Sequence, residues 1–183
     1  PHQVWKMEMT DGIRQALQEG SDSLRAYYEK AGILVARPAK GSSCTLAVSA
    51  KGGNNAENHN HNDIGSYAVA LGKCTMVGDQ GGSFGHPVPV VDGKTQSSGA
   101  KASAIVLKKE FTDVKDLLSI DYTSAYSTPS LDKLVRTFVY DRQGKGSFTV
   151  GDEFTANAPI RFETAITTQA NWKIIDDTHL LLT

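Results

Sequence analysis

The sequence has almost no net charge and no long apolar run, and each of these shortages excludes a class of protein. It has 19 basic and 20 acidic residues among 183, for a formal net charge of -1. Neither nucleic acid nor an anionic membrane surface is therefore expected as a partner. No apolar run approaches the length of about 18 residues that a membrane-spanning helix needs, so we expect no membrane span.

Helical periodicity is also scarce. Residues 11–28 carry the only good helical pattern, with Ile13, Leu17 and Leu24 at near-helical spacing. After Gly32 the chain changes to short runs rich in β-branched and aromatic residues, separated by Gly, Pro, Asn and Asp. The strand-like runs do not alternate with helical ones, so a parallel sheet is not expected. The sequence therefore predicts an all-β fold, an antiparallel β-sandwich with a short N-terminal helical segment.

The expected strands follow one another with turn residues between them. Tight turns are predicted at 71–73, 92–93 and 143–144, where glycine stands between two strand-like runs. In the run 133–141 the side chains that alternate onto one face include Leu134, Arg136, Phe138 and Tyr140. The predicted strands are 33–37, 44–49, 66–71, 74–78, 88–91, 102–109, 117–122, 133–141, 147–153, 160–167 and 172–176.

The length and the two ends of the sequence indicate how the chain is organised. A chain of 183 residues is long enough for one domain with its own core. It begins on Pro1 and ends on an apolar run at 180–182, so we expect a piece of a longer protein. Residues 1–32 would be a helical lead-in or linker, and residues 33–183 the β-domain. The two cysteines, Cys44 and Cys74, lie in strand-like runs and are either two buried thiols or one disulfide.

The stretch 58–63 carries the most distinctive chemistry. His59, His61 and Asp63 stand at every second position, so an extended strand would place all three on one face. Such a face could bind a metal or a substrate anion. The same pattern also occurs on a polar surface strand or in a hydrogen-bonded pair, and the three residues alone leave these interpretations open.

Two residues further along the chain favour a metal. A hairpin over 66–79 that turns at Gly72 would bring Asp79 back beside His61. A glycine-rich stretch at 81–85 would let the backbone return His86 to the same place. Two imidazoles and a carboxylate are a common zinc ligand set, although Asp79 could instead cap a turn and His86 could be a loop histidine. Asp63 would hold the loop or orient an imidazole.

Other chemistries have less support in the sequence. The turn-like runs 42–44 and 97–99 contain serine and cysteine but have no nearby base, which argues against a serine or cysteine hydrolase. Glu57, Asp63 and Asp79 cluster in sequence, but no spacing places two of them across a cleft as a glycosidase requires. Gly53 and the histidine pair match the opening of a cupin motif, but the glutamate that should follow is missing.

Taken together, these stretches resemble the central β-sandwich of the heparinase II/III-like polysaccharide lyases. The resemblance covers nearly the whole chain, and the composite of H-x-H-x-D, a later D-x-G and a histidine before V-D-G is its most specific part. The stretches that carry it are AGILVAR at 31–37, NHNHNDIGSY at 58–67, VGDQGG at 77–82, HPVPVVDGKTQ at 86–96, and the later runs 117–126 and 135–142.

The resemblance implies a role for each candidate residue. His59 would face the active-site cleft and help to bind or neutralise a uronate carboxylate, while His61, Asp79 and His86 would hold a structural zinc. It further implies a β-sandwich of the super-sandwich type and β-elimination on an acidic, uronic-acid-containing polysaccharide. Such proteins act in the periplasm or outside the cell.

In that family the general base comes largely from a separate N-terminal helical toroid. Residues 1–32 would be the exit from this missing partner domain, and the chain would be inactive without it. Two alternatives stay open: a non-catalytic carbohydrate-binding or structural β-sandwich, and a uronate C5-epimerase-like protein, which abstracts the same proton and then replaces it.

Overall fold

A computed structural model describes residues 23–79 and 83–183, and it is built almost entirely from antiparallel strands. The predicted all-β fold is confirmed, while the super-sandwich type stays a prediction. Two single-turn 3-10 helices, η1 (Ser83–Gly85) and η2 (Thr123–Ala125), lie between strands. The strands are β1 (Arg25–Tyr28), β2 (Ile33–Ala36), β3 (Leu46–Lys51), β4 (Asn54–Asn55), β5 (Tyr67–Leu71), β6 (Cys74–Val77), β7 (Val90–Val91), β8 (Gly99–Ser103), β9 (Ile105–Phe111), β10 (Lys115–Asp121), β11 (Leu131–Asp141), β12 (Ser147–Ala156), β13 (Phe162–Glu163), β14 (Trp172–Asp176) and β15 (His179–Leu182).

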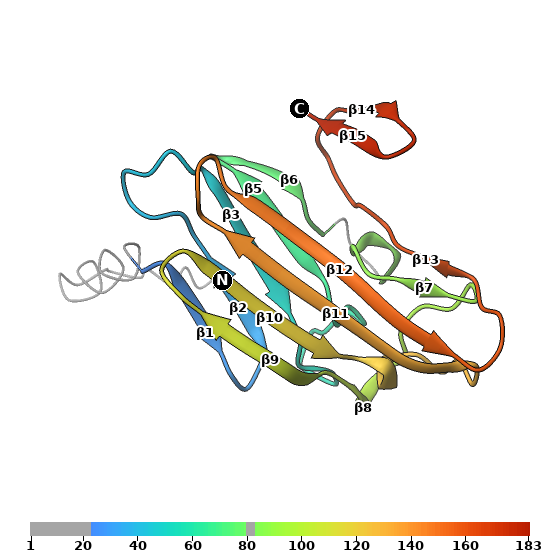
Figure 1. Cartoon of the computed structure of the whole chain (residues 1–183). Helices are drawn as coiled ribbons and strands as arrows, with labels where there is room; N and C mark the ends of the chain where they lie inside the picture. Colours follow the sequence, from blue (N-terminus) through green and yellow to red (C-terminus); the bar gives the residue numbers. More distant parts are fainter. Residues whose placement is uncertain (1–22, 80–82) are drawn as a thin grey trace, which may run out of the picture.

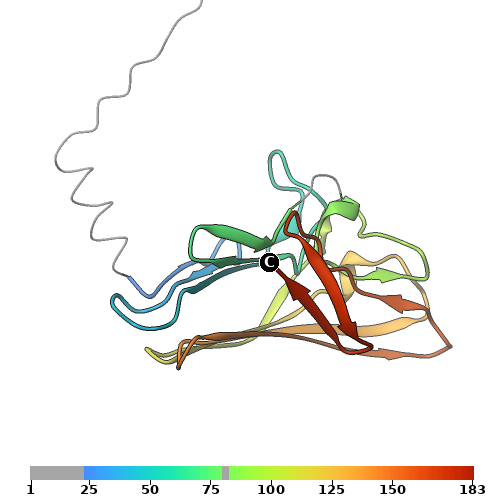
Figure 2. The same cartoon turned by 90° about the horizontal axis from the view of Figure 1, so that it is seen from above.

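Two larger sheets form the body of the molecule. The first sheet has the strand order β1-β2-β3-β5-β6 and the second the order β12-β11-β10-β9. They form two layers when the molecule is seen from above (Figure 2). Three further sheets, β4–β8, β7–β13 and β14–β15, have two strands each, and β14–β15 stands apart from the body at the C-terminal end (Figure 1).

The two larger sheets share one hydrophobic core. The alternation predicted for the run 133–141 is confirmed, because Leu134, Phe138 and Tyr140 of β11 are buried. Residues Leu34 and Val48 of the first sheet belong to the same buried cluster. The ring of Tyr67 on β5 also packs on Phe138, with 6.3 Å between ring centroids. Burial of apolar surface between the layers is therefore what holds them together.

Glycine turns occur where the sequence predicts them. β5 and β6 pair from Leu71 and Cys74 outward, so their loop is the two residues Gly72-Lys73. Gly72 has a φ of 61° and Gly144, in the β11–β12 connection, a φ of 58°. Glycine adopts such positive φ values without steric cost. The β5–β6 hairpin is the one that brings the end of β6 back toward the start of β5.

The predicted N-terminal helix is wrong where the structure describes it. Residues 11–22 lie outside the described residues, but Arg25–Tyr28 form β1 and pair with β2 through Arg25↔Ala36 to Tyr28↔Ile33. The aromatic pair at 27–28 suits a strand better than its weak helical spacing suits a helix, and the pairing with β2 decides the outcome. The proposed domain division of the chain stays a prediction.

The two cysteines do not form a disulfide. Both cysteines are free; Cys44 is buried and Cys74 is exposed, so the prediction of two buried thiols holds for Cys44 only. Among the described residues, none forms a helix that is long and apolar enough to cross a membrane.

Candidate metal centre

Three separate segments bring His61, Asp79 and His86 together. His61 lies in the loop between β4 and β5, Asp79 follows β6, and His86 follows η1. Asp79 reaches the site because the β5–β6 hairpin returns the chain to its starting point. The predicted proximity of Asp79 to His61 is confirmed by a distance of 3.7 Å between Asp79 Oδ2 and His61 Nδ1.

The spacing of the three side chains suits a single small cation. His61 Nδ1 lies 2.8 Å from His86 Nε2, and His86 Nε2 lies 3.4 Å from Asp79 Oδ1. One ligand atom from each residue lies within 4.8 Å of the other two. Tetrahedral zinc with bonds of about 2.0–2.2 Å keeps its ligand atoms about 3.3 Å apart. Small movements of the side chains would therefore be enough for all three to bind one ion.

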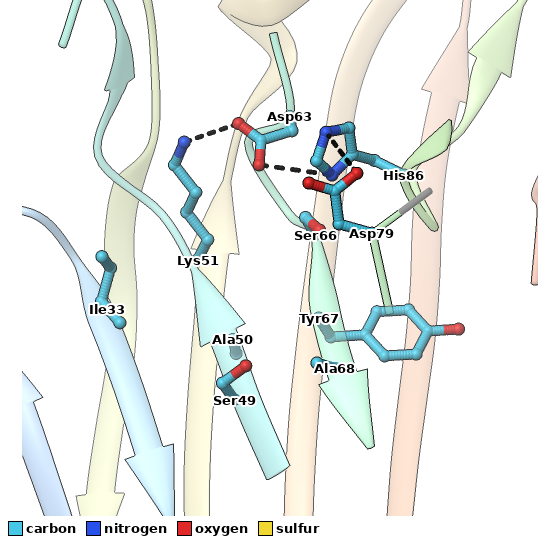
Figure 3. Close-up of a pocket in the computed structure, with 10 residues that line it drawn as sticks. All are labelled: Ile33, Ser49, Ala50, Lys51, Asp63, Ser66, Tyr67, Ala68, Asp79 and His86. Carbon is cyan, nitrogen blue, oxygen red and sulfur yellow. Dashed lines mark hydrogen bonds and ion pairs between the residues drawn. The ribbon is translucent and has the colours of Figure 1, made fainter. Parts of the chain in front are cut away.

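The cluster has a buried side and an open side. The side chain of His86 is 4% exposed, whereas those of His61 and Asp79 are 45% and 50% exposed. An ion held here would rest against the protein through His86 and be reached from solvent past the other two. Figure 3 shows His86 and Asp79 facing one another among the residues that line a pocket.

A lysine and a carboxylate support the buried histidine. Lys51 Nζ donates to Asp63 Oδ1 at 2.5 Å and to Asn60 Oδ1 at 2.7 Å. The other oxygen of Asp63 lies 3.5 Å from His86 Nδ1 (Figure 3). The opposite ring nitrogen of His86, Nε2, is the one that lies next to His61. The contact between Asp63 and Nδ1 is too long for a hydrogen bond, and Nδ1 has no hydrogen-bond partner among the described residues. Asp63 thus stands where an acceptor that orients a metal-binding imidazole would stand.

Residues 58–63 do not adopt the extended conformation that would place His59, His61 and Asp63 on one face. These residues form a turn and loop, in which the Asn60 amide donates to the Glu57 carbonyl at 3.2 Å. His59 has a φ of 55°, a left-handed conformation that no extended strand allows. Asparagine-rich stretches favour such turns over strands. His59 is exposed and is not a member of the His61, Asp79 and His86 cluster.

A pocket of about 260 Å³ adjoins the cluster. Its lining includes the polar side chains of Lys51, Ser66, Asp79 and His86 and the small side chains of Ala50 and Ala68. Figure 3 shows these residues around the ends of β3 and β5. The pocket could hold a small polar group next to an ion bound by the cluster.

Buried polar side chains that the sequence analysis did not single out hold the loops of the site. Gln96 Oε1 accepts from the Ile64 amide at 2.8 Å, and Gln96 Nε2 donates to the Ile64 carbonyl at 2.6 Å. Tyr126 Oη donates to the Pro89 carbonyl at 2.7 Å. Burial raises the pKa of the Tyr126 phenol, so it stays a donor beyond the pH at which an exposed tyrosine ionises. No local pattern indicates these contacts, because they join residues 30 or more positions apart.

Comparison with known proteins adds no assignment to this geometry. No family model matches the chain, and no curated protein matches it.

Proposed function

We propose that His61, Asp79 and His86 bind a structural zinc ion. The observation that carries the proposal is the convergence of two imidazole nitrogens and a carboxylate from three loops, at the spacing given above. Nitrogen and oxygen donors of this kind are typical zinc ligands. An ion there would cross-link the β4–β5 loop to the segments that follow β6 and η1, and its binding free energy would add to the stability of the fold.

Zinc content and stability should change together in the ligand variants. His61→Ala and Asp79→Ala should lose the zinc that the wild-type chain retains after dialysis, as measured by elemental analysis. At free zinc of about 100 to 1000 times its dissociation constant, binding stabilises the wild type by about 3–4 kcal/mol, and a chelator should remove this difference. His179→Ala is the matched control, because His179 is exposed and pairs only with its neighbours Thr178 and Asp176 among the contacts described. A wild-type chain that takes up no zinc would overturn the proposal.

We further propose that this zinc-bound domain forms one wall of the active site of a polysaccharide lyase acting outside the cytoplasm. Support comes from the motif composite and from the exposure of His59, whose imidazole is free of the cluster and accessible to a polymer. β-Elimination removes the weakly acidic C5 proton of a uronate, and the departing glycosidic oxygen leaves from C4. His59 would neutralise the uronate carboxylate and so stabilise the negative charge that develops. A helical partner domain would supply the base.

The lyase proposal is tested with the intact enzyme and uronic-acid polysaccharides, following the absorbance of the unsaturated product. His59→Ala should abolish turnover and leave zinc content and unfolding unchanged. Turnover that survives the substitution would remove His59 from the cleft. Exchange of the C5 proton with solvent deuterium and no unsaturated product would favour the epimerase-like alternative, and polymer binding without either change would favour the carbohydrate-binding one.

A further inference from the structure

A buried arginine of the second sheet reaches both loops that carry the histidine ligands. Arg136 lies on β11 and is completely buried. Its Nη1 donates to the carbonyl of Gly65 at 2.8 Å and to the carbonyl of Pro87 at 2.8 Å. Gly65 is four residues after His61, and Pro87 directly follows His86. One nitrogen atom therefore ties together the two backbone segments from which the imidazoles project.

The rest of the guanidinium contacts a carboxylate and two aromatic rings. Its Nε and Nη2 donate to the two carboxylate oxygens of Asp152 on β12, each at 2.7 Å. The ring centroids of Tyr67 and Tyr122 lie 5.8 and 5.9 Å from Cζ of Arg136. Tyr122 Oη also donates to Asp152 Oδ1 at 3.2 Å. A bidentate pair with two aromatic rings nearby restricts the orientation of the planar guanidinium.

The backbone at Gly65 is adapted to this approach. Gly65 has a φ of +84°, and a Cβ placed there would lie 3.2 Å from the ring of Tyr122 and 3.6 Å from Arg136 Cδ. The absence of a side chain lets the arginine and the tyrosine pack against the loop directly.

We infer that Arg136 is a positioning residue for the metal centre, setting the separation of His61 and His86 through the carbonyls of Gly65 and Pro87 and thereby the zinc affinity. This inference rests on the proposed zinc site. Arg136 contacts neither histidine and acts through the backbone alone. Residues that orient metal ligands from outside the coordination sphere change affinity by about 10- to 100-fold when they are replaced.

Arg142 provides a matched control within the same chain. It is also buried, and it pairs with a buried carboxylate, Asp116. Its other partners are backbone carbonyls too, those of Arg37 and Leu24. These carbonyls belong to the entry of β1 and the end of β2, which carry none of the candidate ligands. Replacing either arginine removes the same kinds of contacts, but only Arg136 is joined to the metal-bearing loops.

The experiment compares Arg136→Lys with Arg142→Lys. Lysine keeps the charge, but its single amino group cannot form a bidentate contact with a carboxylate and also donate to two carbonyls. Both variants should lose stability in the metal-free state. At a temperature where both are folded, Arg136→Lys should bind zinc about 10- to 100-fold more weakly than wild type, as measured by competition with a chromophoric chelator. Arg142→Lys should stay within about threefold of wild type. The visible absorption spectrum of bound Co²⁺ should also shift in Arg136→Lys only.

Each other outcome identifies which statement fails. Wild type that binds neither zinc nor Co²⁺ overturns the proposed site and the inference with it. If the wild type binds zinc while Arg136→Lys and Arg142→Lys have the same zinc affinity and the same Co²⁺ spectrum, that result overturns the inference and leaves the proposed zinc site standing. If Arg136→Lys does not fold, Asp152→Asn serves in its place, because it breaks the bidentate pair and leaves Arg136 in the chain. It should weaken zinc binding by at least about fivefold, and an affinity equal to wild type would overturn the inference.

Discussion

The two large sheets of this protein differ in what their strands contribute. In the second sheet β10, β11 and β12 have seven, eleven and ten residues, and β11 pairs with both neighbours along most of its length. In the first sheet no strand exceeds six residues. The candidate ligands all lie in loops next to the short strands, and none lies on the long ones.

The difference suggests that the loops of the first sheet carry the candidate ligands, and that the second sheet holds these loops in place. Short strands leave long connections in which His61, Asp79 and His86 can be placed freely. Such loops need outside support, because few ladder hydrogen bonds hold them. The support comes from the second layer and its connections, through Arg136 and Tyr126, whose donors meet backbone carbonyls of the ligand-bearing loops.

The largest effect should come from breaking the ion pair that anchors this support. Asp152→Ala would leave the guanidinium of Arg136 buried without its carboxylate partner. Removing one member of a buried pair costs about 3–5 kcal/mol, because the remaining charge is uncompensated. Urea denaturation of the metal-free chain measures the loss. Glu153→Ala, at the exposed neighbouring position of β12, should change stability by less than about 0.5 kcal/mol.

A comparable result for Asp152→Ala and Glu153→Ala would mean that the pair adds little to the metal-free fold. The support from the second layer would then have to reside in Gln96, Tyr126 and the apolar core.

Sequence patterns predicted the fold well wherever the information was local. Alternating side chains in the run 133–141 and glycine at the turns are properties of neighbouring residues, and both were confirmed. The helix predicted at Arg25–Tyr28 is wrong because its helical spacing is weak and these residues pair with β2. Pairing between strands outweighs local propensity in such short segments.

The candidate site was predictable to a similar extent. The β5–β6 hairpin follows from local turn signals, so the approach of Asp79 to His61 could be expected from sequence. The conformation of His59 could not, because regular spacing of histidines says nothing of a turn. The contacts of Arg136 join positions 49 and 71 residues apart, and no local pattern encodes them. Its place among the alternating core residues of β11 was the one available signal.

A smaller effect should appear at Gly146, where the two layers meet at the end of the β11–β12 connection. Gly146 has a φ of +85°, and a Cβ there would clash with the buried Cys44 Sγ. Gly146→Ala should cost about 2–4 kcal/mol, from left-handed strain and overpacking together. Gly144→Ala should cost about 1 kcal/mol from strain alone, since nothing lies within 4 Å of its Cβ position. Thermal unfolding of both variants measures the difference.

The matched test for this clash is the double variant Cys44→Ala/Gly146→Ala, which removes the sulfur. It should be less destabilised than the sum of the two single variants. Additive costs would show that Cys44 yields to the new methyl group without strain, and that only the backbone conformation matters at Gly146.

The smallest effect should come from a single hydroxyl that joins the layers. Tyr140 Oη on β11 donates to the Leu46 carbonyl on β3 at 2.6 Å, so Tyr140→Phe should cost about 1 kcal/mol at neutral pH. Burial raises the pKa of this phenol, and its contact with the Cys44 thiol raises it further. The folded state therefore keeps a proton that the unfolded chain releases near pH 10. The contribution of Tyr140 is fully present below that pH and declines as the pH rises beyond it. The stability of the wild type relative to Tyr140→Phe should shrink above pH 10, as measured by urea denaturation at each pH. A difference that stays constant from pH 8 to pH 11 would show that Tyr140 ionises alike in both states, and that the contact between the layers at this point depends on the ring and not on the hydroxyl.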